Sequence, residues 1–154
     1  MIKKSYRKAM MIILTIISTN VFAQSDEEAI KQTINTLFDG MRKTDTTLIR
    51  DAFTEAPFLQ TVLKNKEGKT VLLTEPLDSF MVAIGKPHKD VYDERIVFDM
   101  IKIDGELASV WTPYKFYVGE KFSHCGVDSF QLVKINGKWK IQYLVDTRRR
   151  QGCE

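Results

Sequence analysis

The chain has 154 residues, with 23 lysine and arginine residues against 20 aspartate and glutamate residues. Four of the basic residues and none of the acidic ones lie in the first 23 positions, so the rest of the chain has 19 basic and 20 acidic residues. This near balance leaves no overall charge that would attract nucleic acid or an anionic membrane, and no nucleic-acid partner is expected. The length suits one domain with one core.

The N-terminus reads as a secretory signal peptide. Four basic residues precede a largely apolar segment, residues 9–22, and Val21-Phe22-Ala23 offers a cleavage site. A membrane anchor is the alternative, but the apolar segment is shorter than the roughly 20 residues that a spanning helix needs. We therefore expect residues 1–23 to be removed, residues 24–154 to form a single domain in the periplasm or outside the cell, and no stable membrane insertion afterwards.

Helices are predicted in the first half of this domain. Ser25 and Glu28 fit a capping box, and apolar residues then recur at helical spacing on one stripe: Ile30, Ile34, Leu37, Phe38 and Met41. A second helix is predicted from about Thr46 to the residues before Pro57. A small hairpin over 58–63 and 69–73 separates it from a third helix, which Thr74 can cap and Gly85 ends.

From Tyr92 onward the apolar residues alternate with polar ones, which is typical of strands. The pattern predicts four strands, at about Tyr92–Ile103, Glu106–Val118, Lys121–Ile135 and Lys138–Thr147. Short turns separate them: Asp104-Gly105, Gly119-Glu120 and Asn136-Gly137. The expected fold is α+β, with three N-terminal helices packed on a curved antiparallel sheet made of a long four-strand meander plus the small hairpin.

If all three turns have two residues, the pairing of the strands follows from them. Asp128 then lies between Trp111 and Val145, and His124 lies opposite Lys115 in a charged rim with Glu94. The face predicted to meet the helices carries Ile96, Phe98, Met100, Trp111, Phe130, Leu132, Trp139, Ile141, Tyr143 and Val145. A β-bulge in any strand would invalidate the pairing beyond it.

The opposite face is more apolar than a solvated face needs. It is predicted to carry Val97, Ile101, Val110, Tyr114, Phe116, Val127 and Val133. A homodimer through this outer face would cover these residues. Scattered apolar residues on an exposed sheet are an equally good interpretation.

Two features lie near the C-terminus. Arg148-Arg149-Arg150 is most simply a solvated chain end. Cys125 and Cys153 are the only cysteines. Export makes a disulfide between them chemically possible, while a CxxC redox pair and a thiolate metal site are excluded by number and spacing.

The order of helices followed by a long meander resembles the NTF2-like fold, the cone-shaped α+β family of ketosteroid isomerases, scytalone dehydratase and SnoaL-type cyclases. The likeness rests on the 27–41 helix, the strand segment GVDSFQL (126–132) and GKWKI (137–141). The segments 123–133 and 146–153 look like an exported bacterial subgroup labelled "putative lumazine-binding". The resemblance implies a cavity between the helices and the concave sheet face, and a frequent homodimer across the outer sheet face.

The first functional hypothesis is a pocket that binds a small, largely apolar molecule without a reaction. The candidate ligand-binding residues are Phe98, Trp111, Asp128, Phe130 and Tyr143, since a few polar groups in an apolar cavity are the usual form of such a site. Ordinary core packing is the alternative for each aromatic residue. A carboxylate such as Asp128 on an apolar face is costly unless it is paired.

An acid/base enzyme is the second hypothesis: an isomerase, dehydratase or cyclase. Asp128 would be the base, with His124 and Tyr143 as partners, because an apolar wall tunes a carboxyl for proton transfer. The third hypothesis is a protein-interaction module of the envelope. No cofactor is expected, and no metal site either, because His88 and His124 are the only histidines.

Overall fold

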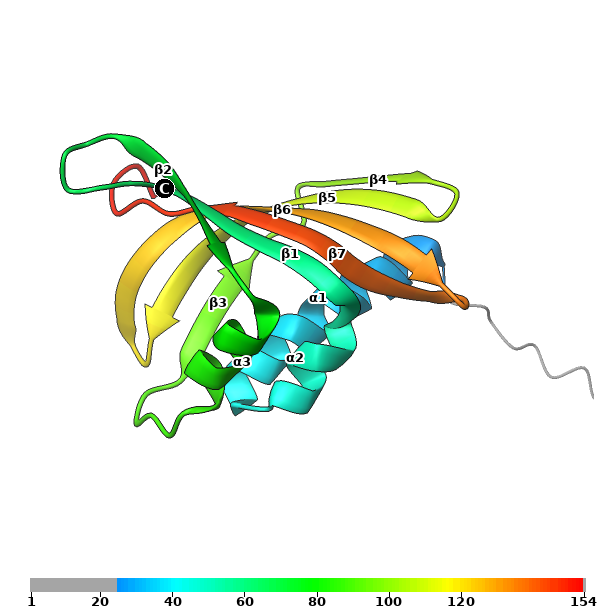
Figure 1. The fold of residues 1–154 in the computed structure, drawn as a ribbon, viewed down its shortest axis with the longest axis horizontal. Helices are drawn as coiled ribbons and strands as arrows, with labels where there is room; N and C mark the ends of the chain where they lie inside the picture. Colours follow the sequence, from blue (N-terminus) through cyan, green and yellow to red (C-terminus); the bar gives the residue numbers. More distant parts are fainter. Residues whose placement is uncertain (1–24, 154) are drawn as a thin grey trace, which may run out of the picture.

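The structure is a computed structural model that describes residues 25–153, so the predicted signal peptide lies outside the described residues. Three helices cover one side of an open, mixed seven-stranded sheet (Figure 1). The helices are α1 (Asp26–Lys43), α2 (Thr46–Ala52) and α3 (Leu77–Gly85). The strands are β1 (Phe53–Lys64), β2 (Thr70–Glu75), β3 (Tyr92–Ile96), β4 (Met100–Asp104), β5 (Leu107–Val118), β6 (Lys121–Ile135) and β7 (Lys138–Thr147). The fold is therefore α+β, as predicted.

The sheet is mixed, which corrects the prediction of a purely antiparallel one. The strand order is β2-β1-β7-β6-β5-β3, and β4 also pairs with β5. β1 runs parallel to β7, while all other pairs are antiparallel. The predicted small hairpin exists as β1 and β2, but β1 has 12 residues and joins the main sheet.

The predicted strand Tyr92–Ile103 is two strands, β3 and β4, because its register on β5 changes by one residue. Ile96 pairs with Tyr114, whereas Met100 pairs with Trp111. At the next turn Asp104 pairs with Leu107, so the two-residue loop is Gly105-Glu106 and not Asp104-Gly105.

Helix α1 shows why the N-terminal prediction succeeded. The Ser25 side chain accepts a hydrogen bond of 3.2 Å from the Glu28 backbone N–H, as the capping pattern requires. Its apolar stripe is buried: Ile30, Ile34, Leu37, Phe38 and Met41. This stripe packs on the sheet, where Phe130, Leu132, Trp139 and Ile141 are also buried, as predicted.

Two register shifts overturn part of the predicted pairing. β5 and β6 start in the predicted register but shift between Phe116 and Tyr117, so Thr112, and not Trp111, lies opposite Asp128. The same shift places Phe116, and not Lys115, opposite His124. A bulge adds one residue to one strand, and a change of one residue moves side chains to the other face of the sheet.

The second shift lies between β6 and β7. Leu132 pairs with Ile141 as predicted, but Gln131 then pairs with Tyr143, which was predicted to pair with Phe130. Asp128 consequently lies opposite Asp146, not Val145.

The two shifts reverse the predicted faces of β5 and of the second half of β7. Trp111 lies on the outer face with Met100, and 41% of its surface is exposed. Val110, Thr112 and Tyr114 were predicted outside, but they are buried on the side of the helices.

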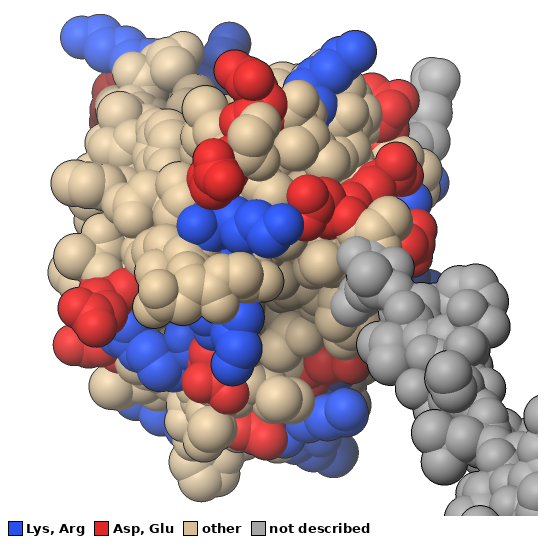
Figure 2. Space-filling model, turned by 90° about the vertical axis from the view of Figure 1, so that its right-hand side faces the viewer, with Lys and Arg blue, Asp and Glu red and all other residues tan. Residues whose placement is uncertain are grey.

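Charges of both signs are mixed on the face of the molecule drawn in Figure 2, and an area without charged side chains lies beside them. This matches the near balance of acidic and basic residues. No helix within residues 25–153 is long and apolar enough to cross a membrane.

Candidate functional site

A pocket of about 380 Å³ lies between α1, α3 and the inner face of the sheet. Its walls are mostly apolar and come from both helices and from three strands: Leu37, Phe38, Met41, Phe80, Ala83, Ile84, Tyr92, Phe116, Val118 and Leu144. This size and lining are typical of small-molecule sites.

Polar groups gather at one side of this pocket: Glu94, His124, Asp128, Asp146 and Arg148, with Glu75 at its edge. The register explains why they meet. Thr112, Asp128, Asp146 and Thr61 form one row across β5, β6, β7 and β1. Glu94, Phe116 and His124 form a second row across β3, β5 and β6.

Asp128 is the most buried of these groups, with 2% of its surface exposed. Its Oδ2 accepts a hydrogen bond of 3.1 Å from the Thr112 hydroxyl. Burial, and then the neighbouring carboxyls of Glu94 and Asp146, raise the pKa of Asp128 well above its ordinary value.

Glu94 and Asp128 line the same side of the pocket. Burial, reinforced by the charge of Asp146, raises the pKa of Glu94 to about 8. Two adjacent carboxyls in an apolar surrounding do not both ionise, because like charges repel and neither is well solvated. The pair Glu94–Asp128 therefore retains a proton near neutral pH and presents both a hydrogen-bond donor and acceptors to the pocket.

Asp146 differs because it has a cationic partner. Its Oδ2 accepts a hydrogen bond of 2.9 Å from Arg148 Nε, and the Tyr114 hydroxyl lies 3.2 Å from the same oxygen. Its Oδ1 accepts a hydrogen bond of 2.5 Å from the Thr61 hydroxyl. This set of donors matches an ionised carboxylate.

His124 lies at the mouth of the pocket. Its Nδ1 is 3.0 Å from the Ser123 hydroxyl, and its ring is 4.9 Å from the Phe116 ring. Burial, and then the positive charge of Arg148, lower the pKa of His124, which favours the neutral imidazole.

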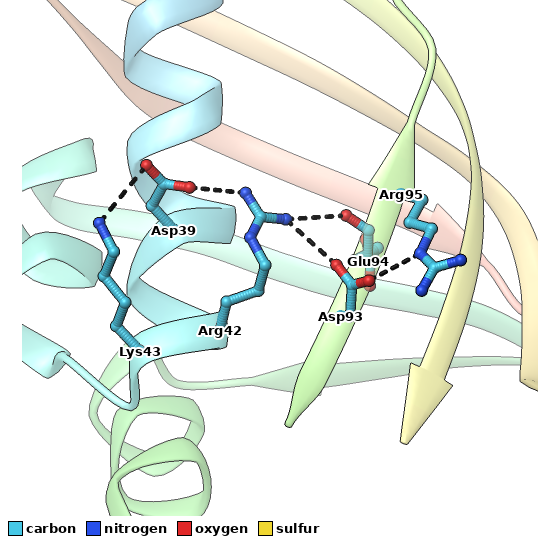
Figure 3. Close-up of polar contacts among 6 residues, drawn as sticks. All are labelled: Asp39, Arg42, Lys43, Asp93, Glu94 and Arg95. Atoms are coloured by element: carbon cyan, nitrogen blue, oxygen red, sulfur yellow. Dashed lines mark hydrogen bonds and ion pairs between the residues drawn. The ribbon is translucent and has the colours of Figure 1, made fainter. Parts of the chain in front are cut away.

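Glu94 is held in place by an ionic chain between α1 and β3 (Figure 3). The Arg42 guanidinium donates to Asp39 at 2.6 Å, to Asp93 at 3.4 Å and to the Glu94 carbonyl at 3.4 Å. Asp93 also accepts from Arg95 Nε at 2.7 Å. Because successive residues of a strand point to opposite faces, this anchoring of Asp93 and Arg95 directs the Glu94 side chain toward the pocket.

The C-terminal segment is fastened to β6 next to the pocket. Cys125 and Cys153 form a disulfide, and Cys125 and Arg149 exchange two backbone hydrogen bonds of 2.9 Å. Gly126 permits this approach, because a Cβ there would lie 1.7 Å from the Thr147 carbonyl oxygen. The arginine cluster therefore begins on a fixed segment, while Arg148, Arg149 and Arg150 are all exposed to solvent, as predicted.

The structure brings two of the predicted site residues, Asp128 and His124, into the pocket. Phe130 lies in the core, edge-on to Phe38 at 6.3 Å, and Phe98 packs at the core periphery. Trp111 and Tyr143 lie on the outer face, where the Tyr143 hydroxyl donates to Gln60 at 2.6 Å. These four do not line the pocket. The bulges turn Trp111 and Tyr143 to the outer face, whereas Phe130 and Phe98 belong to the core and its periphery.

Sequence reasoning missed three polar residues of the pocket. Glu94 was assigned to a charged rim, Arg148 to the chain end, and Asp146 to no site. Their convergence depends on the bulges, and no local motif marks it. Within residues 25–153, no group of three or more histidine, cysteine, aspartate and glutamate residues is arranged to hold a metal ion.

Comparisons with known proteins agree with this architecture. A family model described as "Putative lumazine-binding" matches residues 25–143. No curated protein matches the chain in sequence. Among solved structures, an NTF2-like protein of unknown function from Shewanella baltica has a TM-score of 0.63 at 20% identity, covering 82% of this chain and 95% of its own.

Two further structures share the fold. A protein of unknown function from Mycobacterium tuberculosis has a TM-score of 0.67 at 13% identity, covering 82% of this chain and 73% of its own. The beta subunit of a putative aromatic-ring-hydroxylating dioxygenase from Novosphingobium aromaticivorans has a TM-score of 0.64 at 13% identity, covering 79% and 87%. Since the family model spans most of the chain, the chain belongs to the "Putative lumazine-binding" family, and its fold is that of the NTF2-like proteins it resembles.

Proposed function

We propose that this protein binds a small, largely apolar molecule in the pocket between α1, α3 and the sheet. The observation that carries the proposal is a cavity of about 380 Å³ with mostly apolar walls and the carboxyl groups of Glu94 and Asp128 at one side. Apolar walls supply the binding free energy, and a few buried polar groups orient the ligand.

The carboxyl pair Glu94–Asp128 selects a ligand with a polar edge. The protonated carboxyl donates a hydrogen bond to a carbonyl oxygen or ring nitrogen of the ligand, and the other carboxyl oxygens accept from an N–H or O–H group. A fused heteroaromatic ring has such an edge and flat apolar faces. The description of the family makes lumazine the first ligand of this kind to test.

N-Phenyl-1-naphthylamine, whose fluorescence rises in apolar sites, tests the pocket directly. We expect the protein to bind this probe and lumazine to displace it. Ala83→Trp places a large side chain in the pocket wall and weakens probe binding about tenfold or more, since it removes apolar contact area. Val82→Trp is the matched control, because Val82 lies next to it on α3 but is 61% exposed and outside the pocket. Equal probe binding by both variants and the wild type contradicts the proposal.

The raised pKa of the carboxyl pair favours a second candidate function, an acid/base isomerase, dehydratase or cyclase. A carboxyl with a pKa near neutrality is suited to proton transfer. Asp128 and His124 of the original hypothesis lie in the pocket, and Glu94 takes the place of Tyr143, which lies on the outer face. Asp128→Asn is expected to abolish any turnover and to keep probe binding. A screen of steroid-like and polyketide-like substrates without turnover by the wild type contradicts the enzyme.

Two further proposals concern the setting of the protein. We propose that residues 1–23 direct export to the periplasm or beyond, which fits a disulfide between Cys125 and Cys153. N-terminal sequencing of host-purified protein tests this, and an intact Met1 contradicts it.

The outer sheet face is proposed as a homodimer interface, because Phe58, Met100 and Trp111 are exposed there. Size-exclusion chromatography with light scattering is expected to give a dimer, which Trp111→Asp converts to monomer. A wild-type monomer at all concentrations contradicts the dimer.

A further inference from the structure

A basic cleft adjoins the pocket and shares two residues with it. The cleft measures about 770 Å³ and lies between the β1–β2 hairpin and the C-terminal segment, which Figure 1 shows side by side. It is lined by Val62, Leu63, Lys64, Thr70, His124, Arg148, Arg149, Arg150 and Gln151. His124 and Arg148 also line the apolar pocket, so the two cavities are neighbours at these side chains.

The charge of the cleft is one-sided. Four of its lining residues, Lys64, Arg148, Arg149 and Arg150, are basic and none is acidic. Arg148 uses its Nε for Asp146, while its two terminal nitrogens donate to no residue in the described range 25–153. Within the same range, neither Lys64 nor Arg150 forms an ion pair. These groups are therefore free to bind an anion.

The position of these groups is built into the fold. The disulfide Cys125–Cys153 and the paired backbone of Cys125 and Arg149 fix the segment on both sides of Arg150. Arg148 directly follows the last residue of β7, and the buried Asp146 carboxylate orients its Nε. An arginine that is held through Nε presents its two terminal nitrogens to a ligand. This pair of donors is suited to a carboxylate, sulfonate or phosphate.

We propose that the ligand is amphipathic: an apolar body in the pocket carries an anionic group that binds in the adjoining cleft to Arg148, Lys64 and Arg150. This inference rests on the proposed binding function and adds the chemical class of the ligand.

Two fluorescent probes with the same apolar body test the inference. 1-Anilinonaphthalene-8-sulfonate carries a sulfonate, and N-phenyl-1-naphthylamine lacks it. We expect the sulfonate probe to bind about tenfold more tightly to the wild type, because a charge-assisted hydrogen bond contributes that much. Its affinity falls as sodium chloride is added, whereas the affinity of the neutral probe does not.

The variant Lys64→Gln/Arg150→Gln removes two charges from the cleft and keeps the Arg148–Asp146 pair. It is expected to lower the affinity of the sulfonate probe about fivefold and to leave the affinity of the neutral probe unchanged. Lys102→Gln/Lys138→Gln is the control, since it removes the same charge at the other end of the sheet (Figure 1) and is expected to change neither probe.

The outcomes separate the two proposals. If the cleft variant weakens neither probe, weakens both equally, or matches the control, the anionic group is contradicted while the apolar pocket stands. If neither probe binds the wild type, or if Ala83→Trp weakens the binding of neither probe, the proposed binding function is contradicted as well. Sodium decanoate and decyl phosphate as competitors then show whether a carboxylate or a phosphate is preferred.

Discussion

At the scale of single residues, Glu94 and Asp128 are the groups whose chemistry departs most from that of an exposed side chain. Both are carboxyls near Asp146, and only Asp146 has a cation beside it. Holding two such groups together costs free energy when they ionise. A protein tolerates this cost at a functional site more readily than in an ordinary core.

This cost predicts how stability depends on pH. The pKa of Glu94 rises from an ordinary value of 4.5 to about 8 in the folded protein, so between these values the folded state binds more protons than the unfolded state. Stability from this group is complete below pH 4.5, declines as pH rises, and is lost above pH 8. Denaturant unfolding from pH 5 to 9 measures the decline. Glu94→Gln is expected to remove roughly 2 kcal/mol of this decline in the free energy of unfolding, because the partly solvated Glu94 carboxyl contributes less than a fully buried one.

A matched variant completes this test. Glu55→Gln removes a carboxyl that is exposed on β1 and is expected to keep the wild-type pH dependence. A Glu94→Gln protein whose stability declines as steeply as the wild type would show that the pair does not hold the extra proton.

At the scale of secondary-structure elements, α1, the β5–β6–β7 hairpins and the turn at Asn136-Gly137 follow from the sequence, because capping residues and turn residues act locally. The parallel pairing of β1 with β7 does not, since it joins residues that are far apart in the chain. The two bulges also have no local signal. They reverse the faces of Trp111 and Tyr143, and this is why these two candidate residues were misplaced.

Gly126 is the residue of β6 that the close approach of the chain end requires. A methyl group there would overlap the Thr147 carbonyl and the Tyr114 ring, so Gly126→Ala forces β6 and the C-terminal segment apart. The expected loss is roughly 3 kcal/mol of stability, or about 10 °C in the unfolding temperature. Thermal unfolding followed by circular dichroism measures it. Ser129→Ala on the same strand should stay near the wild type, and an equally stable Gly126→Ala protein would contradict the described packing.

The disulfide acts on the same segment from its other end. It closes a loop with a sequence separation of 28, so Cys125→Ser/Cys153→Ser is expected to lower stability by about 3 kcal/mol. Release of the C-terminal segment is also expected to lower the affinity of the sulfonate probe and to leave that of the neutral probe unchanged. Reduction of the wild type should reproduce both effects. If stability falls while the affinity of the sulfonate probe is unchanged, the tail does not position the anion-binding groups.

At the scale of the whole molecule, the helices and the sheet enclose a space that the core does not fill. The core lies between α1, α2 and the middle of the sheet, and the pocket opens beyond it, between α1, α3 and the strand ends. The family and the fold are shown by sequence and structure together, while the ligand is a proposal from the lining of this pocket.

Native mass spectrometry of protein purified from its own host tests this proposal most directly. The wild type and Val82→Trp are expected to carry a co-purifying small molecule of constant mass, and Ala83→Trp is expected to lose it. A wild-type protein that repeatedly carries no bound molecule, or an Ala83→Trp protein that carries the same one, would contradict a ligand in this pocket.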